Sequence, residues 1–308
     1  MGVSTGDFDQ DGDTDIISVC DGAPNLFFEN VGDGNFEEAA VLRGLAFDLR
    51  GRANGNMGID VADVDGDLLE DLFVTTYTGQ LPTLFINSPG GFFADQTRRS
   101  RIGTEVIPHV NWSAGLVDLN NDGLRDAFIC NGHFLKKNAE LTGSTSFAVR
   151  NIVMQNQPDN RFVPVSLDLG GDARSSSSRG AVFDDLDNDG DIDVAILNCD
   201  APAQLLENQN PSQQNWLELE LIARSGNRNG LGAKVTLQSD SGQQFAERRA
   251  GRGYQSDCGG RLHFGLGNDA AATRLTIVWP GGASQSLENV AANQILTVIQ
   301  PLEQRSEE

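Results

Sequence analysis

The sequence has few cysteines and histidines, the residues that carry zinc and thiol redox chemistry. Its 308 residues include only four cysteines and three histidines, and no Cys-x-x-Cys pair occurs. Zinc and thiol redox sites need closely spaced cysteines or histidines, so both have little support. We expect Cys20, Cys130 and Cys199 to pack as small buried hydrophobic residues in equivalent strands, and Cys258 lies apart from them in the chain. One disulfide of undetermined connectivity stays possible.

Basic residues and long apolar runs are also scarce. The 22 lysines and arginines face 44 acidic residues, which gives a net charge of −22 and a pI near 4.3. Nucleic-acid-binding proteins and proteins that bind anionic lipid present basic patches, so neither class fits. No run reaches the roughly 18 apolar residues of a membrane span. The 35 glycines and only three methionines favour a turn-rich β protein.

Much of the acid is concentrated in four loops of one pattern, 7–15, 63–71, 118–126 and 185–193. Each loop carries oxygen-bearing side chains at its positions 1, 3, 5 and 9, and this is the hard-oxygen ligand set that Ca²⁺ prefers. Where position 7 is leucine, its backbone carbonyl is the simplest ligand. The sequence therefore predicts up to four Ca²⁺ ions. The candidate ligands are Asp7, Asp9, Asp11, Asp13, Asp15, Asp63, Asp65, Asp67, Leu69, Asp71, Asp118, Asn120, Asp122, Leu124, Asp126, Asp185, Asp187, Asp189, Asp191 and Asp193.

An EF-hand is the obvious competing interpretation of these loops, and the sequence excludes it. An EF-hand needs a bidentate glutamate at loop position 12 and flanking helices. Position 12 is instead Ser18, Val74, Ile129 or Ile196, each inside a strand-like run. Position 6 is glycine in three loops, where it permits a left-handed turn. The second loop has Leu68 there, so its geometry and its occupancy are the least certain of the four.

The loops also define a repeat of about 55 residues, the length of one four-stranded propeller blade. Each loop precedes a short apolar strand, and a second strand follows after a turn. The first strands are expected at Ile16–Val19, Leu72–Thr75, Ala127–Ile129 and Val194–Leu197, and the second at Asn25–Asn30, Thr83–Asn87, Asn151–Asn156 and Gln204–Asn208. At these residues the chain resembles FG-GAP/VCBS-type calcium-loop propellers, over roughly residues 1–210. The weaker motif Asn131-Gly-His133 is similar to one in bacterial relatives of cartilage acidic proteins, and we expect His133 to be structural.

From Asn215 the pattern changes to strict alternation, as in Trp216–Ile222, and no calcium loop follows. Further strands are expected at Ala233–Leu237, Gln244–Arg248, Leu275–Trp279 and Ile295–Ile299. This segment resembles the ASPIC/UnbV domain at Asn215–Leu217, Asn229–Ala233, Arg249–Tyr254, His263–Gly267 and Val278–Gly282. The resemblance implies a small all-β, sandwich-like domain with no agreed enzymatic activity. We therefore expect Arg249, Tyr254 and His263 to be structural.

The expected organisation is all-β, with about four propeller blades at 1–212, the ASPIC/UnbV domain at 213–301 and an acidic tail at 302–308. Related propellers carry about seven blades. Either four blades close a ring, or the C-terminal domain covers an open edge, or the chain is the C-terminal part of a larger propeller. We favour the last hypothesis, in which truncation has also removed a signal peptide.

These features predict a secreted, periplasmic or cell-surface protein. The expected function is a non-catalytic, calcium-binding scaffold or adhesion module that binds an extracellular protein or glycan. One alternative is a structural component of a larger envelope or matrix assembly. A propeller enzyme acting on polysaccharide is less well supported, because histidines are few, no nucleophile elbow occurs, and the loops use many of the carboxylates.

Overall fold

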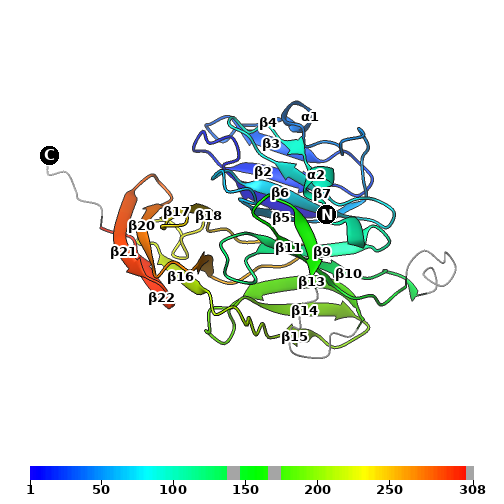
Figure 1. Cartoon of the computed structure of the whole chain (residues 1–308). Coiled ribbons are helices and arrows are strands. Elements are labelled where there is room, and N and C mark those ends of the chain that lie inside the picture. The colour runs from blue at the N-terminus through cyan, green and yellow to red at the C-terminus, as the bar shows by residue number, and fades with distance from the viewer. Residues whose placement is uncertain (137–145, 166–174, 303–308) are drawn as a thin grey trace.

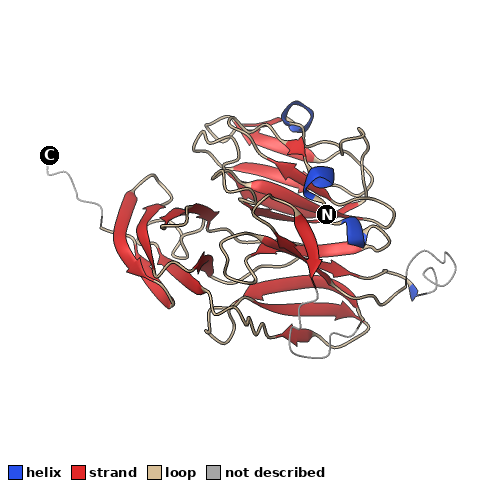
Figure 2. Ribbon diagram, viewed as in Figure 1, coloured by secondary structure: helices blue, strands red, loops and turns tan. Residues whose placement is uncertain are grey.

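The computed structural model describes residues 1–136, 146–165 and 175–302 of the chain. Strands dominate it, and the helices α1 (Ala40–Arg43), α2 (Thr97–Ser100) and η1 (Thr104–Val106) are each about one turn long (Figures 1 and 2). The predicted all-β class is confirmed. Most of the predicted acidic tail, residues 303–308, lies outside the described residues.

The N-terminal part of the chain folds into four antiparallel sheets that follow the chain order, and we call them blades 1 to 4 (Figure 1). Blade 1 contains β1 (Gly2–Gly6), β2 (Asp15–Val19), β3 (Leu26–Asn30) and β4 (Phe36–Glu38); blade 2 contains β5 (Asn56–Ala62), β6 (Asp71–Thr76), β7 (Thr83–Ile86) and β8 (Ala94–Asp95); blade 3 contains β9 (Asn111–Val117), β10 (Asp126–Asn131), β11 (Ile152–Asn156) and β12 (Phe162–Val165); blade 4 contains β13 (Ser177–Asp184), β14 (Asp193–Cys199) and β15 (Gln204–Leu206).

The acidic loop joins the first and second strands of every blade in the same register. Its ninth residue pairs with the residue that immediately precedes the loop, in Gly6↔Asp15, Ala62↔Asp71, Val117↔Asp126 and Asp184↔Asp193. A strand places alternate side chains on opposite faces, so this register gives each blade the same two apolar faces.

Neighbouring blades pack face to face, and a separate core fills each of the three gaps. Phe8, Phe27 and Val19 of blade 1 meet Leu72 and Phe85 of blade 2. Equivalent cores join blade 2 to blade 3 and blade 3 to blade 4. The first strands β1, β5, β9 and β13 lie next to one another in that order. The repeat therefore gains its stability from the contacts between blades.

The described blades form an open row, with blades 1 and 4 at opposite ends (Figure 1). On the outer face of blade 4, Leu197 and Leu205 are 66% and 62% exposed. Their counterparts in blade 3, Cys130 and Val153, are 0% and 7% exposed because blade 4 covers them. A closed four-blade ring would bury these leucines, so this alternative is wrong for the described residues.

The C-terminal part is a two-sheet module. One sheet has the order β19-β16-β22 and the other β18-β17-β20-β21. The strands are β16 (Asn215–Ile222), β17 (Lys234–Gln238), β18 (Gln243–Glu247), β19 (Arg261–Gly267), β20 (Ala271–Val278), β21 (Ser284–Ala291) and β22 (Gln294–Ile299). Leu217, Leu219, Val235, Phe264 and Ile277 fill the space between the sheets. The alternation in Trp216–Ile222 thus predicted a buried strand correctly, whereas β21 was missed because most of its residues are polar and face solvent.

Candidate metal centres

All four acidic loops adopt one backbone conformation. Positions 4 and 6 are left-handed throughout, at Gln10 (φ 65°) and Gly12 (φ 101°), Gly66 (φ 79°) and Leu68 (φ 71°), Asn121 (φ 62°) and Gly123 (φ 88°), and Asn188 (φ 66°) and Gly190 (φ 92°). The second loop was expected to have the least certain geometry because its position 6 is leucine. It nevertheless keeps left-handed residues at the same two positions as the other loops. Its glycine serves position 4, and Leu68 adopts the conformation that glycine has elsewhere.

Because Leu68 adopts a left-handed conformation that glycine adopts without strain, we predict that Leu68→Gly stabilises the protein. A left-handed leucine costs about 1–2 kcal/mol, and the added flexibility of glycine in the unfolded chain offsets part of the gain. We expect a net increase in unfolding free energy of about 0.5–1 kcal/mol, measured by urea denaturation. Gln10→Gly, at a left-handed position of the first loop, should give a similar gain. No gain from either variant would show that the loops are not strained.

The first residue of every loop holds the turn together, because one of its carboxylate oxygens accepts the backbone N–H of position 6. The N···O distance is 3.1 Å from Gly12 to Asp7 and 2.7 Å from Gly123 to Asp118. The side chain at position 5 likewise accepts the N–H of position 7, as Asp67 does from Leu69 at 2.8 Å. These bonds hold the loop closed around its carboxylates.

The ninth residue has a different and equally constant role. Asp71 is fully buried, and its Oδ2 accepts the N–H of Val64 at 2.9 Å while its Oδ1 accepts the N–H of Asn87 at 2.8 Å. The same pair of bonds recurs at Asp15, Asp126 and Asp193. The ninth aspartate therefore ties its loop to the end of the third strand of the same blade.

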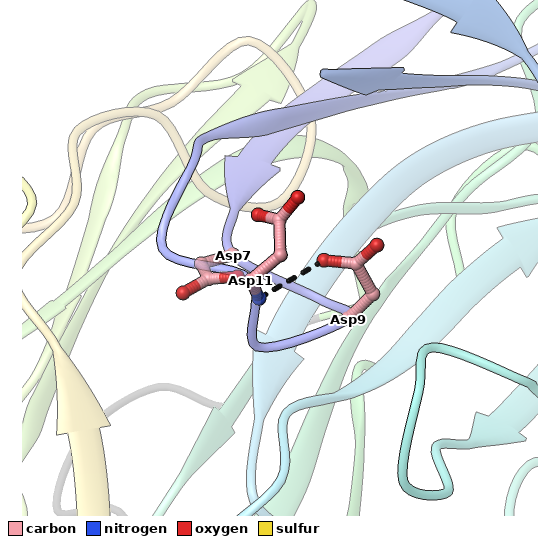
Figure 3. Close-up of side chains that lie close together, drawn as sticks. All are labelled: Asp7, Asp9 and Asp11. Carbon is pink, nitrogen blue, oxygen red and sulfur yellow. Dashed lines mark hydrogen bonds between the residues drawn. The ribbon is translucent and has the colours of Figure 1, made fainter. Parts of the chain in front are cut away.

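Three loops bring carboxylates together. In each group, one oxygen atom per residue lies within 4.8 Å of the others, and the groups are Asp7, Asp9 and Asp11; Asp63, Asp65 and Asp71; and Asp185, Asp187 and Asp193. Figure 3 shows the first group, in which the backbone N–H of Asp11 donates to Asp9 Oδ1 at 3.2 Å. In the first loop Asp15 stays outside the group, and in the other two position 5 does. The third loop has Asn120 at position 3 and forms no acidic trio among the described residues.

Position 7 supplies no carboxylate to these groups. In the fourth loop, Asp191 Oδ1 accepts Asn121 Nδ2 at 2.8 Å and its Oδ2 accepts the N–H of Asn210 at 3.1 Å. Its side chain is thus held by neighbouring segments. A backbone carbonyl ligand at this position, which the sequence suggested for Leu69 and Leu124, stays a prediction.

The loops fit a hard divalent cation. Asp7 Oδ1 and Asp65 Oδ1 are buried without a hydrogen-bond partner. Burial and the carboxylate of Asp122 raise the pKa of Asp118 to about 7, and burial together with Asp118 raises the pKa of Asp126 to about 8. Buried oxygens and an excess of negative charge are the features that a bound cation would satisfy. Ca²⁺ would be held by the loop carboxylates and would neutralise their mutual repulsion.

The first loop differs from the second because protein cations already contact its ligands, and in the fourth loop Arg261 lies 3.9 Å from Asp185 Oδ2. The Lys234 ammonium group pairs with Asp7 Oδ2, and Arg43 lies 3.4 Å from Asp9 Oδ2. We therefore expect the first loop to bind Ca²⁺ more weakly than the second loop.

Comparison with known families matches two segments of the chain. Residues 7–74 match the FG-GAP-like repeat model, and residues 223–305 match the ASPIC and UnbV model. The chain combines an FG-GAP-like repeat with an ASPIC and UnbV segment. Both resemblances predicted from the sequence are confirmed. The boundaries 1–212 and 213–301 stay a prediction.

Human cartilage acidic protein 1 is 26% identical to this chain over 322 residues, which cover 100% of this chain and 44% of the human protein. The mouse protein is 26% identical and covers 97% of this chain and 45% of its own length. The chain thus spans less than half of these relatives. A lectin from Agrocybe aegerita, described as recognising non-reducing terminal N-acetylglucosamine, aligns with a TM-score of 0.40 and 20% identity over 67% of this chain and 51% of the lectin. That likeness is too distant to support an argument.

The ASPIC and UnbV module lies against the FG-GAP-like blades through the Arg249–Tyr254 motif. Arg249 forms a bidentate, buried ion pair with Glu70, the eighth residue of the second loop, with Nη1 2.7 Å from Oε1. Arg252 bonds both oxygens of Asp60 in β5 at 2.7 Å. Gly253 exchanges backbone hydrogen bonds with Ile59, also in β5. The motif therefore inserts against the first strand of blade 2.

The module also contacts the third and fourth loops. His263 Nε2 lies 3.1 Å from the carbonyl oxygen of Gly190, and Arg261 Nη2 donates to Asn188 Oδ1 at 2.7 Å. Gly267 N–H donates to the carbonyl oxygen of Asn121 at 2.8 Å. Together with Lys234 at the first loop, the module reaches all four loops. The sequence did not predict this arrangement, although Asp60, an acid within an otherwise largely apolar strand, was a signal of it.

The other residues singled out from the sequence have local contacts. His133 is buried and stacks on Phe134 with ring centroids 4.8 Å apart, and its Nδ1 accepts the N–H of Leu135 at 3.0 Å. Tyr254 packs edge-on against Trp112, with centroids 5.0 Å apart. All four cysteines carry free thiols, and burial raises the pKa of Cys130. No described helix is long and apolar enough to cross a membrane.

Proposed function

We propose that the chain is a calcium-stabilised, non-catalytic scaffold of an extracellular or cell-envelope protein. Its similarity to cartilage acidic proteins supports the extracellular setting. The single observation that carries the role of calcium is the repetition of one loop geometry in four blades, with carboxylate trios in three of them. In this proposal Ca²⁺ links the first two strands of each occupied blade.

The cleft between module and blades supports the non-catalytic part of this proposal. It has a volume of about 750 Å³, open solvent included, and its lining includes Glu70, Glu218, Glu247 and His263. Each of these glutamates is paired with an arginine: Glu70 and Glu247 with Arg249, and Glu218 with Arg261. In this proposal the glutamates serve as partners in structural ion pairs, and burial raises the pKa of Glu218 and of Glu247 to about 7. We propose that the ligand, an extracellular protein or glycan, binds the outer surfaces of the blades.

Calcium removal tests the proposal. The chain is melted in EDTA and in excess CaCl₂, with MgCl₂ as the ion control. When free calcium exceeds Kd about tenfold, each occupied site adds about 1.4 kcal/mol to the unfolding free energy, so we expect the midpoint to rise by several degrees. Asp187→Asn should reduce the rise of the melting midpoint in calcium. Asp240→Asn, at an exposed site outside the loops, should leave that rise unchanged. Identical melting curves in EDTA and calcium would refute the proposal.

A further inference from the structure

The asparagine that ends the third strand of a blade reaches back to the loop of the preceding blade. Asn87 Nδ2 donates to the carbonyl oxygen of Phe8 at 2.9 Å, and Asn208 Nδ2 donates to that of Leu119 at 2.8 Å. Asn156 Nδ2 makes the same bond to Val64 at 3.1 Å. The acceptor is always the second residue of the preceding loop. All three asparagine side chains are buried.

The same asparagines also hold the ninth aspartate of their own loops. The backbone N–H of Asn87 donates to Asp71 Oδ1, and that of Asn156 donates to Asp126 Oδ1, both at 2.8 Å. Asn208 makes the equivalent 2.8 Å bond to Asp193. Each asparagine thus contacts a candidate calcium ligand through its backbone and the neighbouring loop through its side chain.

These bonds join into one line that crosses all four blades. The other oxygen of Asp71 accepts the N–H of Val64, and the carbonyl of Val64 accepts the side chain of Asn156. The pattern then repeats through the third loop to Asp193 and the N–H of Leu186 in the fourth. Buried hydrogen bonds in such a chain polarise one another, so a change at one loop is felt at the next.

A second bond fixes the orientation of two of these amide groups, those of Asn87 and Asn156. Asn87 Oδ1 accepts the N–H of Ser88 at 2.8 Å, and Asn156 Oδ1 accepts the N–H of Gln157 at 2.9 Å. With its oxygen committed to a donor, each amide must turn its NH₂ group toward the preceding loop. The bond between blades is therefore specific to asparagine, because aspartate would place an oxygen against the carbonyl.

We propose that Asn87, Asn156 and Asn208 couple the four loops, so that the chain binds Ca²⁺ cooperatively. This inference rests on the proposed function. Ion binding at one loop holds its ninth aspartate and its second peptide group in place. The asparagine transmits that constraint to the loop of the adjoining blade, which then loses less freedom when it binds.

The test is calcium titration calorimetry on the full chain, with a double-mutant cycle. We expect a Hill coefficient above 1 for the wild-type chain. Asp187→Ala, which disables the fourth loop, should weaken the remaining sites about fivefold, the lower end of common couplings. In the Asn208→Ala background, Asp187→Ala should cause no further weakening. The matched control is Asn30→Ala, because Asn30 Nδ2 bonds Thr14 of its own loop at 3.3 Å and should leave the Hill coefficient unchanged.

Each outcome bears on a different statement. Absence of calcium binding by the wild-type chain would refute the proposed function. Binding with a Hill coefficient of 1, or additive effects of Asp187→Ala and Asn208→Ala, would overturn the coupling and leave the function standing. A purely structural asparagine would lower the melting midpoint equally in EDTA and calcium with cooperativity unchanged, and that result also overturns the inference.

Discussion

Arg249→Ala is expected to lower the unfolding free energy by about 3–5 kcal/mol, the usual cost of leaving a buried charge without its partner. Arg249 is buried against Glu70 and also lies 3.6 Å from Glu247. Removing the guanidinium group leaves two buried carboxylates facing each other. Urea denaturation in the presence of calcium gives the measurement.

The pH dependence of this loss follows from the same contacts. Burial and the neighbouring Glu70 already raise the pKa of Glu247 to about 7, and loss of Arg249 raises it further. A carboxylate with a raised folded-state pKa destabilises the fold fully above that pKa, and the penalty declines as the pH falls from that value toward the ordinary pKa of 4.5. The variant should therefore be impaired more at pH 8 than at pH 5.5. The control is Arg274→Ala, whose exposed pair with Glu288 is expected to contribute less than about 1 kcal/mol. A loss from Arg249→Ala as small as that of the control would contradict the interpretation.

Gly190→Ala is expected to be the most damaging change within a loop. Gly190 is left-handed, and an added Cβ would overlap the indole ring of Trp216. The strain of the left-handed conformation costs about 1–2 kcal/mol, and forced overlap in a packed site adds about 1–3 kcal/mol. Relief of the overlap would move the module away from the fourth loop, so calcium affinity should fall together with stability.

Gly12→Ala separates these two causes, because Gly12 occupies the same loop position with φ 101° and an added Cβ there meets no atom within 4 Å. The unfolding free energy of this variant should therefore fall only by the cost of the strained backbone, about 1–2 kcal/mol. The double variant Gly190→Ala/Trp216→Ala should recover calcium affinity at the fourth loop relative to Gly190→Ala alone. Equal losses from Gly190→Ala and Gly12→Ala would show that Trp216 does not hold the loop. Unfolding free energies and calcium isotherms provide both measurements.

The fold class and the repeat could be predicted because their determinants are local. Spacing within a nine-residue loop identified the candidate oxygen ligands, and the residue at position 12 excluded the EF-hand. Alternation in Trp216–Ile222 predicted β16, and apolar runs after the loops predicted the second strand of every blade. Strand β21 was not predicted, because most of its residues are polar and exposed and so lack the apolar pattern of a buried face.

The candidate site was predicted only in part, because its remaining contacts join residues far apart in the chain. Arg249 and Glu70 are separated by 179 residues, and Asn156 reaches Val64 across 92. The periodic pattern of apolar and polar residues carries no information about pairs so far apart in the chain. The left-handed conformation of Leu68 also could not be predicted from the sequence, since the tertiary fold imposes a conformation that leucine disfavours.

The sequence by itself determined the acidic loops, the repeat and the two family resemblances, since each depends on residues within one short segment. Only the tertiary structure decided that the C-terminal module covers the loops, that blade 4 leaves its outer face open, and that three asparagines join the loops in series. These features come from packing between blades and between modules. That packing is set by the shapes of whole surfaces and not by the order of residues within any one of them.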